Sequence, residues 1–315
     1  MIGTKILGFG GYQPDRVVTN DDLAKVVDTN DEWIRARVGI QSRRFARDDE
    51  TVADMAEAAG AKALAASGLE PSAVDLVIVA TCSTESPMPN VAATVASRLG
   101  IPAPGAYDLN AACAGFCYGI GSASDAVHAG SARNVLVIGA EKMTSWVDQH
   151  DRSTCIIFAD GAGAAVVGPS GPGEPTGIGP VVWGSAGDQA HKITIEGRNG
   201  SLHQDGQAVF RWATTAMAPV ALEACRRAGV TPADITAFIP HQANLRIIES
   251  IARKLGIPRE FVADDIITAG NTSSASIPLA LARMAEQGRL QPGKPALLLA
   301  FGAGLSYASQ VVTVP

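Results

Sequence analysis

Three polar residues occupy positions where the chain could carry out chemistry, namely Cys113, His241 and Asn271. Each follows a strand-like apolar run and precedes a helix-like segment. In α/β folds, ligands bind where strands end at their carboxyl side and helices begin. Cys113 also lies at the start of its helix-like segment, where the helix dipole and free N–H groups favour the thiolate. It is therefore a candidate nucleophile, with a buried structural cysteine as the alternative.

His241 and Asn271 fit polar roles beside a ligand, but each has a simpler interpretation. A single histidine is often a surface or core residue, and Asn271 lies in a Ser-rich run where turns and helix caps are common. Cys155 lies in a strand-like run. The cysteines expected to be core residues are Cys82, Cys117, Cys155 and Cys225.

The elements that must position these residues alternate between strand-like and helix-like segments. The expected strands are 76–80, 106–109, 135–139, 164–167, 237–240, 261–263, 296–301 and 310–314. The expected helices are 53–67, 91–99, 116–129, 213–228, 245–255 and 277–287. This alternation predicts an α/β fold whose sheets are covered by helices.

Short sequence matches recur in the same order in both parts of the chain. Residues 98–102 match a later segment at an offset of 156, whereas 67–71 and 135–139 match later segments at an offset of 161. Matches in one order at nearly one spacing predict two duplicated α/β halves. At the shorter offset, Cys113 and Asn271 would hold almost equivalent positions and would meet where the halves join.

A Gly- and Pro-rich region, residues 168–187, marks the junction between these halves. We expect an N-terminal half over residues 1–170 that carries the candidate nucleophile. The C-terminal half, residues 171–315, would carry the histidine and the asparagine. Residues 190–207 are polar and are expected to form an irregular surface excursion.

The composition of the 315-residue chain excludes several classes of function. A net charge of −6 argues against nucleic acid as a partner, because nothing would neutralise a phosphate backbone. Apolar runs are only strand-sized, so no membrane insertion is expected. The five cysteines and the absence of a signal-like N-terminus fit a cytoplasmic protein. No Cys-x-x-Cys occurs and the histidines are scattered, so no metal site is expected.

Taken together, these residues and their contexts resemble β-ketoacyl-acyl-carrier-protein synthase III of the thiolase superfamily, in particular its actinobacterial members. The matching segments are 31–34, 112–116, 151–152, 160–164, 241–244, 270–273 and 302–307. They span nearly the whole chain. The resemblance implies a thiolase-like five-layer αβαβα fold built from two duplicated halves, and a homodimer.

The resemblance implies an acyltransferase that starts type II fatty acid synthesis by decarboxylative Claisen condensation. A short acyl-coenzyme A primer would acylate Cys113, and the N–H groups of Cys113 and Ala303 would form the oxyanion hole. Malonyl-acyl carrier protein would then lose carbon dioxide, while a neutral His241 and Asn271 donate hydrogen bonds to its thioester oxygen. No metal or other cofactor is implied.

Contacts to coenzyme A also follow from the resemblance. Trp33 and Arg152 resemble the pair that sandwiches the adenine, Arg37 resembles a phosphate contact, and Asn244 is assigned to the same ligand. Gln207 replaces the asparagine of a Gly-Asn-x-Val-Phe motif, which puts a pantetheine contact there in doubt.

Contacts to proteins follow in the same way. The segment that resembles the docking site for the acyl carrier protein consists of Gln242, Ala243, Asn244, Leu245 and Arg246. Arg246 suits an acidic partner. Met88 lies in the loop that, in relatives, closes the acyl pocket of the partner subunit.

Three other interpretations stay open. Variants such as Ala-Cys-Ala-Gly-Phe-Cys resemble synthases that prime type II polyketide assembly. A Cys/His/Asn thioester hydrolase shares the residue order, although papain-like enzymes carry a different setting around the cysteine. A scaffold that only binds acyl-coenzyme A would not require all three polar residues.

Overall fold

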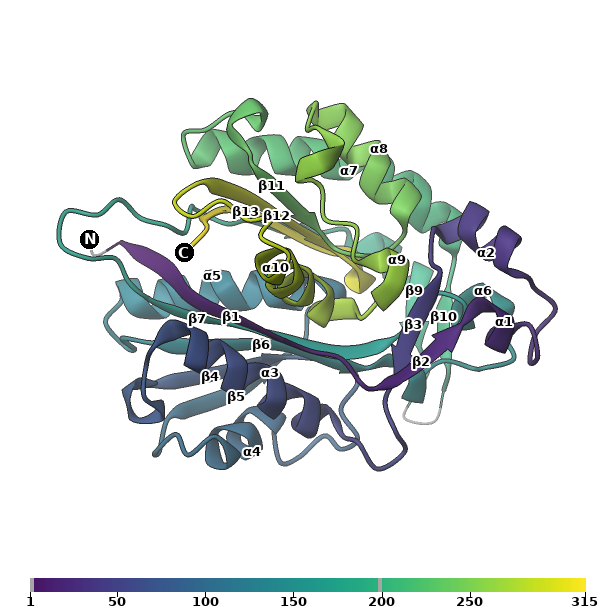
Figure 1. Ribbon diagram of the computed structural model, residues 1–315, viewed down its shortest axis with the longest axis horizontal. Coiled ribbons are helices and arrows are strands. Elements are labelled where there is room, and N and C mark those ends of the chain that lie inside the picture. Colours follow the sequence, from purple (N-terminus) through teal and green to yellow (C-terminus); the bar gives the residue numbers. More distant parts are fainter. Residues whose placement is uncertain (1–2, 198–199) are drawn as a thin grey trace.

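A computed structural model describes residues 3–197 and 200–315, and it contains two sheets that face each other across a layer of helices (Figure 1). The first sheet has the strand order β1-β7-β6-β4-β5. These strands are β1 (Thr4–Tyr12), β4 (Leu76–Ala80), β5 (Gly105–Leu109), β6 (Val135–Lys142) and β7 (Asp160–Pro169). Strands β4, β5 and β6 run parallel, and β1 and β7 are antiparallel to their neighbours.

The second sheet repeats this arrangement with the order β11-β12-β13-β8. Its strands are β8 (Val182–Ser185), β11 (Ala237–Pro240), β12 (Pro295–Phe301) and β13 (Ser306–Thr313). Strands β11 and β12 run parallel, and β13 is antiparallel to β12 and β8. The central strands β6 and β12 are buried along almost their whole length and are mostly apolar, as expected for strands covered on both faces.

Helices form the other three layers, so the described chain is a five-layer αβαβα sandwich (Figure 1). The outer layer on the first sheet consists of α3 (Val52–Ser67) and α4 (Val91–Arg98). The middle layer consists of α5 (Gly115–His128) and α10 (Ser276–Glu286). The outer layer on the second sheet consists of α7 (Gly206–Arg227) and α8 (Leu245–Leu255).

Close approach of the middle layer to the first sheet depends on glycine. A Cβ atom on Gly163 in β7 would lie 2.5 Å from the backbone nitrogen of Leu279 in α10. A Cβ atom on Gly139 in β6 would collide with the backbone at Ser274, just before α10. The second half of the chain therefore rests directly on the sheet of the first.

The two halves share one strand register. Leu76 pairs with Val135 in the first sheet, and the residues 161 positions later, Ala237 and Ala296, pair in the second. Helices α5 and α10 also begin 161 residues apart, each after a short 3₁₀ turn. With this spacing, the residue of the first half that is equivalent to Asn271 is Asn110 and not Cys113. The expected equivalence of Cys113 and Asn271 is therefore wrong.

Three local expectations also differ from the structure. The expected strand 261–263 is reduced to one bridge between Phe238 and Val262, because the chain turns into a 3₁₀ helix just before it. Cys155 ends a short helix, α6 (Arg152–Cys155), instead of lying in a strand. Residues 190–207 are not a simple surface excursion, since β9 (Ile193–Ile195) and β10 (Leu202–Gln204) pair within them.

Small elements lie together at one end of the sandwich (Figure 1). They are β2 (Arg16–Thr19), α1 (Asn20–Leu23), α2 (Asp31–Val38), β3 (Ser42–Phe45), α6 and α9 (Ile266–Ala269). Asn30 caps α2 by accepting the N–H of Trp33, and Gly39 ends the helix in the left-handed region. None of the described helices combines the length and apolar character needed to cross a membrane.

Candidate active site

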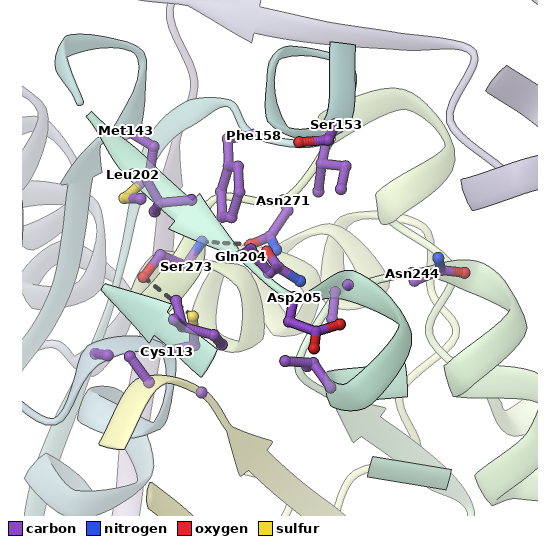
Figure 2. Close-up of a pocket in the computed structure, with 18 of the residues that line it drawn as sticks. Cys113, Met143, Ser153, Phe158, Leu202, Gln204, Asp205, Asn244, Asn271 and Ser273 are labelled. Carbon is purple, nitrogen blue, oxygen red and sulfur yellow. Dashed lines mark hydrogen bonds between the residues drawn. The ribbon is translucent and has the colours of Figure 1, made fainter. Parts of the chain in front are cut away.

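The three candidate residues from the two halves line one cavity of about 900 Å³ (Figure 2). Cys113 comes from the turn before α5, His241 follows β11, and Asn271 precedes α10. His241 and Asn271 are buried, whereas Cys113 is half-exposed to the cavity. The structure thus brings together residues that are up to 158 positions apart in the sequence.

The backbone around Cys113 is packed against the turn after β12. A Cβ atom on Gly302 would lie 2.7 Å from the Cβ and 2.9 Å from the nitrogen of Cys113, so only glycine fits there. Ala303 follows directly and lines the same cavity. Among the described residues, neither the Cys113 N–H nor the Ala303 N–H donates a hydrogen bond to another residue. Both donors therefore remain available for an oxygen of a ligand.

The thiol of Cys113 is neutral in the resting site. Burial raises its pKa to about 12, and the carboxylate of Glu141 acts in the same direction. The hydroxyl of Ser273, 3.4 Å from the sulfur, opposes this increase. The direction is opposite to the one expected from a helix N-terminus alone, because desolvation dominates.

His241 is held as a neutral imidazole. Burial lowers its pKa to about 3. Its Nδ1 lies 2.7 Å from the hydroxyl oxygen of Ser276, which also accepts the N–H of Gln242. The Ser276 hydrogen is then free to donate to Nδ1, which places the imidazole proton on Nε2. That N–H is the donor His241 offers to a ligand.

Asn271 is fixed by its own backbone and by the next turn. Its N–H donates to the carbonyl of Ile157, and its Oδ1 accepts the N–H of Ser273 at 2.9 Å (Figure 2). With Oδ1 engaged, the NH₂ group is the part left for a ligand. His241 and Asn271 therefore each present an uncharged N–H donor to the cavity.

The mouth of the cavity carries the expected aromatic–cation pair, but the two residues stack on each other. The guanidinium carbon of Arg152 lies 4.9 Å from the ring centre of Trp33. Arg152 also donates to the carbonyl of Asp28 at 2.8 Å. A flat ring between Trp33 and Arg152 therefore requires the arginine to move away from the indole.

Arg37 and Asn244 also line the cavity near its mouth. Asn244 caps α8 by accepting the N–H of Arg246, and its NH₂ group donates to the carbonyl of Arg37 at 3.3 Å. The side chain of Arg37 is exposed. The hydrogen bond from the Asn244 side chain to the Arg37 carbonyl thus joins α8 to α2 across the entrance.

The expected docking segment divides into a buried and an exposed part. Gln242 is 1% exposed and donates to the carbonyl of Pro240 while accepting the N–H of Ile266. Its side chain does not reach the outer surface, which corrects its assignment as a docking contact. Arg246 is exposed, and its guanidinium carbon lies 5.3 Å from the ring centre of Phe210. Ala243 and Leu245 are half-buried.

Sequence reasoning missed several residues of the site. Cys82 was expected in the core, yet it lines the cavity and contacts Glu141 through its backbone N–H and its sulfur. Glu141 lies near the end of β6, and nothing in the sequence around it indicates a role in the site. The β9–β10 region supplies cavity wall, including Leu202, which lies near Met143 (Figure 2).

Met88 does not belong to the cavity of its own chain. Its side chain is 77% exposed in the loop that leads to α4. The edge strand β5 lies near this loop, because Asn90 donates to the carbonyl of Ala106. Tyr107 on the same strand is also exposed. Among the described residues, no group of three or more His, Cys, Asp or Glu side chains is arranged to hold a metal ion.

A five-layer fold from two similar halves, with a thiol facing two uncharged N–H donors in one cavity, defines a condensing enzyme of the thiolase superfamily. Family models for 3-oxoacyl-[acyl-carrier-protein] synthase III match residues 107–187, and for its C-terminal part residues 225–314. The chain belongs to the 3-oxoacyl-[acyl-carrier-protein] synthase III family, and it is an enzyme of the acyltransferase type.

Curated relatives agree over the full length. The β-ketoacyl-[acyl-carrier-protein] synthase III 4 of Streptomyces coelicolor is 54% identical over 99% of both chains, and synthase III 2 of Streptomyces avermitilis is 52% identical over 100% of both. Among solved structures, the priming β-ketosynthase of the R1128 polyketide pathway has a TM-score of 0.97 and 44% identity, covering 100% of this chain and 97% of that one. The synthase III of Aquifex aeolicus has a TM-score of 0.95 and 41% identity, covering 99% and 100%.

Proposed function

We propose that the chain condenses a short acyl-coenzyme A primer with malonyl-acyl carrier protein and releases carbon dioxide and a 3-ketoacyl-acyl carrier protein. This reaction initiates type II fatty acid synthesis. The observation that carries the proposal is the single cavity in which Cys113 faces the neutral donors His241 and Asn271. The full-length similarity to β-ketoacyl-[acyl-carrier-protein] synthases supports the same reaction.

In the first half-reaction, the sulfur of Cys113 attacks the thioester carbon of the primer and coenzyme A leaves. The carbonyl oxygen of the primer becomes negatively charged. The unengaged N–H groups of Cys113 and Ala303 stabilise that charge, each donor contributing on the order of 3 kcal/mol in comparable sites.

In the second half-reaction, malonyl-acyl carrier protein loses carbon dioxide and leaves an enolate. The Nε2–H of His241 and the NH₂ group of Asn271 donate to the enolate oxygen. Neither donor carries a charge, so neither would protonate the carbanion before it attacks the acyl group on Cys113. No other cofactor takes part in this scheme.

Basic residues at the cavity mouth fit phosphorylated and acidic substrates. Arg37 and Arg152 suit the phosphates and adenine of coenzyme A, together with Trp33 and Asn244. The docking surface for the acidic carrier protein consists of Ala243, Asn244, Leu245 and Arg246. All five cysteines are free thiols, which supports a cytoplasmic location.

We also propose a homodimer that forms along β5. This strand is one of the two edges of the first sheet; it carries the exposed Tyr107, and the exposed Met88 lies in the neighbouring loop. Pairing two such edges covers both backbone edges and the exposed side chains. Met88 would then reach the acyl pocket of the partner. On this view the two halves of the chain divide near residue 170, between β7 and β8.

A second function, priming of a type II polyketide pathway, has one specific observation in its favour. The priming β-ketosynthase of the R1128 pathway has a TM-score of 0.97 with this chain. Both functions use the same chemistry and differ in the primer. The exposed, flexible Met88 leaves room for primers beyond acetyl at the proposed pocket.

Intact-protein mass spectrometry with a panel of acyl-coenzyme A primers tests both proposals. We expect one acyl adduct on the wild type and none on Cys113→Ala. Addition of malonyl-acyl carrier protein should discharge the adduct to a 3-ketoacyl product. An acetyl or short branched preference supports fatty acid initiation, whereas a longer or unusual primer supports polyketide priming. Release of free acid without malonyl-acyl carrier protein would instead indicate a hydrolase.

A further inference from the structure

A buried carboxylate that the proposed mechanism does not use lies behind the nucleophile. Glu141, near the end of β6, is fully buried, and its oxygens accept hydrogen bonds from one backbone N–H and several side chains. The donors are Thr81, Cys82, Ser83, Ser273 and Ser274. Burying a carboxylate is costly, and this network compensates for it with hydrogen bonds instead of an ion pair.

Among the described residues, no lysine, arginine or histidine forms an ion pair with Glu141. The neighbouring Lys142 points away and donates to the backbone carbonyls of Arg47, Asp48 and Glu50. Proton uptake by Glu141 therefore breaks no ion pair. This distinguishes the residue from a structural carboxylate locked to an arginine or lysine.

Ser273 joins this carboxylate to the nucleophile. Its hydroxyl oxygen lies 2.9 Å from Oε1 of Glu141. The same oxygen lies 3.4 Å from the sulfur of Cys113, the contact drawn in Figure 2. The hydroxyl is not required by the turn, because Ala112 holds the equivalent place in the first half. The φ angles of Ala112 and Ser273 are 46° and 51°. The first half thus makes the same turn without a hydroxyl.

We propose that Ser273 and Glu141 receive the thiol proton of Cys113 during acylation and return it during condensation, with Ser273 touching the sulfur and Glu141 acting through Ser273. The proposal deepens the proposed function and rests on it. The thiol of Cys113 needs a group that accepts its proton. His241 does not provide one, because its Nδ1 is bonded to Ser276 and its Nε2 carries the proton that it donates to the substrate.

The proton balance closes over both half-reactions. As the sulfur of Cys113 bonds to the acyl carbon, its proton passes to Ser273 and the Ser273 hydrogen passes to Oε1 of Glu141. The bond to the sulfur of coenzyme A breaks, and that thiolate takes a proton from water. In condensation the enolate carbon displaces the Cys113 sulfur, which recovers the proton from Glu141 through Ser273. One proton is consumed per cycle, as the decarboxylation requires.

A proton on Oε1 of Glu141 displaces two other side-chain donors, the Cys82 thiol and the Ser274 hydroxyl. The sulfur of Cys82 lies 3.9 Å from the hydroxyl oxygen of Ser273, which is a second acceptor for it. The Ser274 hydroxyl, which also donates to Oε1, lies 2.8 Å from the carbonyl of Ala80 and keeps that acceptor. Ser273 then accepts from the new carboxylic acid. The network accommodates both protonation states with small rotations of hydroxyl groups.

The decisive test compares Glu141→Gln, Ser273→Ala and Ser274→Ala in single-turnover acylation by acyl-coenzyme A at pH 7. Ser273→Ala places alanine where the first half already has one, so the variant should fold. We expect Glu141→Gln and Ser273→Ala to slow acylation by about 100-fold. Ser274→Ala, which removes a donor at the same distance from Glu141 without touching Cys113, should slow it by no more than about threefold.

A second readout separates a relay from a structural role. The titratable groups that face Cys113 are Glu141 on β6, Cys82 after β4 and His241 after β11. Removal of the Glu141 charge lowers the pKa of the Cys113 thiol, and loss of the Ser273 hydroxyl raises it. Iodoacetamide alkylation of the peptide that contains Cys113 should therefore shift to lower pH in Glu141→Gln and to higher pH in Ser273→Ala.

The relay requires Glu141→Gln to acylate slowly although its thiol ionises more easily. If Glu141→Gln acylates as fast as the wild type or faster, the carboxylate only opposes ionisation and the proposal is wrong. Equal losses in Ser273→Ala and Ser274→Ala would also overturn it. Alkylation needs no primer, so it can be measured even if no primer acylates the wild type, an outcome that would contradict the proposed function. Absent alkylation shifts would show that neither Glu141 nor Ser273 acts on the thiol and would refute the relay independently of acylation.

Discussion

Asn110 and Asn271 make the same hydrogen bond in the two halves of the chain. The side-chain oxygen of each accepts the backbone N–H two residues later, at 3.1 Å from Ala112 and 2.9 Å from Ser273. Each bond fixes a turn with a positive φ angle just before a helix of the middle layer. The two residues differ in burial, because Asn110 is exposed and Asn271 is buried beside His241.

This relationship makes Asn271→Asp a sharp test of the donor role of Asn271. Aspartate keeps the oxygen that accepts the Ser273 N–H but lacks the NH₂ group that faces the cavity. We expect decarboxylation of malonyl-acyl carrier protein to slow by about 100-fold or more, while acylation of Cys113 is retained. Release of carbon dioxide and the acyl adduct should be measured on the same preparation. Decarboxylation at close to the wild-type rate would contradict the assignment.

Substitution of Gly302 should disable the nucleophile without a change in its chemistry. In Gly302→Ala the new methyl group would lie 2.7 Å from the Cβ atom of Cys113 and displace it. We expect acylation to slow by about 100-fold, since a small misplacement of a reacting group has effects of this size. Gly187→Ala is the matched control, because its methyl group meets nothing within 4 Å. Equal rates in both variants would show that the contact at Gly302 relaxes easily.

The buried His241 predicts how stability depends on pH. Its pKa is about 3 in the folded protein and near 6.5 when unfolded, so between these values the unfolded chain binds more protons. The free energy of unfolding should therefore fall as pH decreases from 6.5 towards 3, by up to about 5 kcal/mol from this residue. Denaturant titrations at several pH values should show a shallower decrease for His241→Asn. Identical slopes would mean that the imidazole becomes protonated in the folded state.

The contact between Arg152 and Trp33 predicts a selective effect on the nucleotide part of the primer. We expect Arg152→Ala to raise KM for acyl-coenzyme A by about tenfold, since cation–π and stacking contacts contribute about 1 kcal/mol or more. Acyl-pantetheine, which lacks the nucleotide, should be used equally well by both proteins. Steady-state kinetics with the two primers measure this ratio. A similar loss with acyl-pantetheine would place Arg152 nearer to the reacting thioester than we propose.

Arg246 should affect the carrier protein more than the primer. We expect Arg246→Glu to lower kcat/KM for malonyl-acyl carrier protein by at least tenfold at low salt, and by less at high salt. Acylation by the primer should change little. Arg133→Glu makes the same charge change on an exposed side chain away from the cavity and serves as the control. If both variants lose activity equally, net charge and not a docking contact would explain the effect.

The sequence was sufficient to predict most of the fold, and the three residues that it singled out line one cavity. The bounds expected for β11 and α8 agree with the structure, because β11 is an apolar run that ends at Pro240 and α8 is an amphipathic segment that Gly256 ends. The equivalence of Cys113 with Asn271 failed because the loop between β4 and α4 is longer than that between β11 and α8. The offset between the halves therefore varies along the chain, and the match at 156 misled the comparison.

Residues that act through contacts between distant segments could not be found in the same way. Glu141 lies near the end of an otherwise mostly apolar strand and resembles any polar residue at a strand end. Its neighbours Ser273 and Ser274 come from the other half. For Gln242 the sequence suggested an exposed residue where the structure has a buried one. It belongs to the same short segment as the exposed Arg246, but its side chain points into the protein.

The offset of 161 residues that relates β4 to β11 and β6 to β12 has a consequence for how the enzyme loses activity on heating or in denaturant. The residue 161 positions after Glu141 is Gly302, so one half contributes a carboxylate beside the start of α10 and the other a glycine packed tightly against Cys113, just before α5. Each half alone holds an incomplete catalyst. Any loosening of α5 against α10 would separate the thiol from its partners before either sheet opens. Mild heat or denaturant should therefore inactivate the enzyme while its secondary structure is still intact.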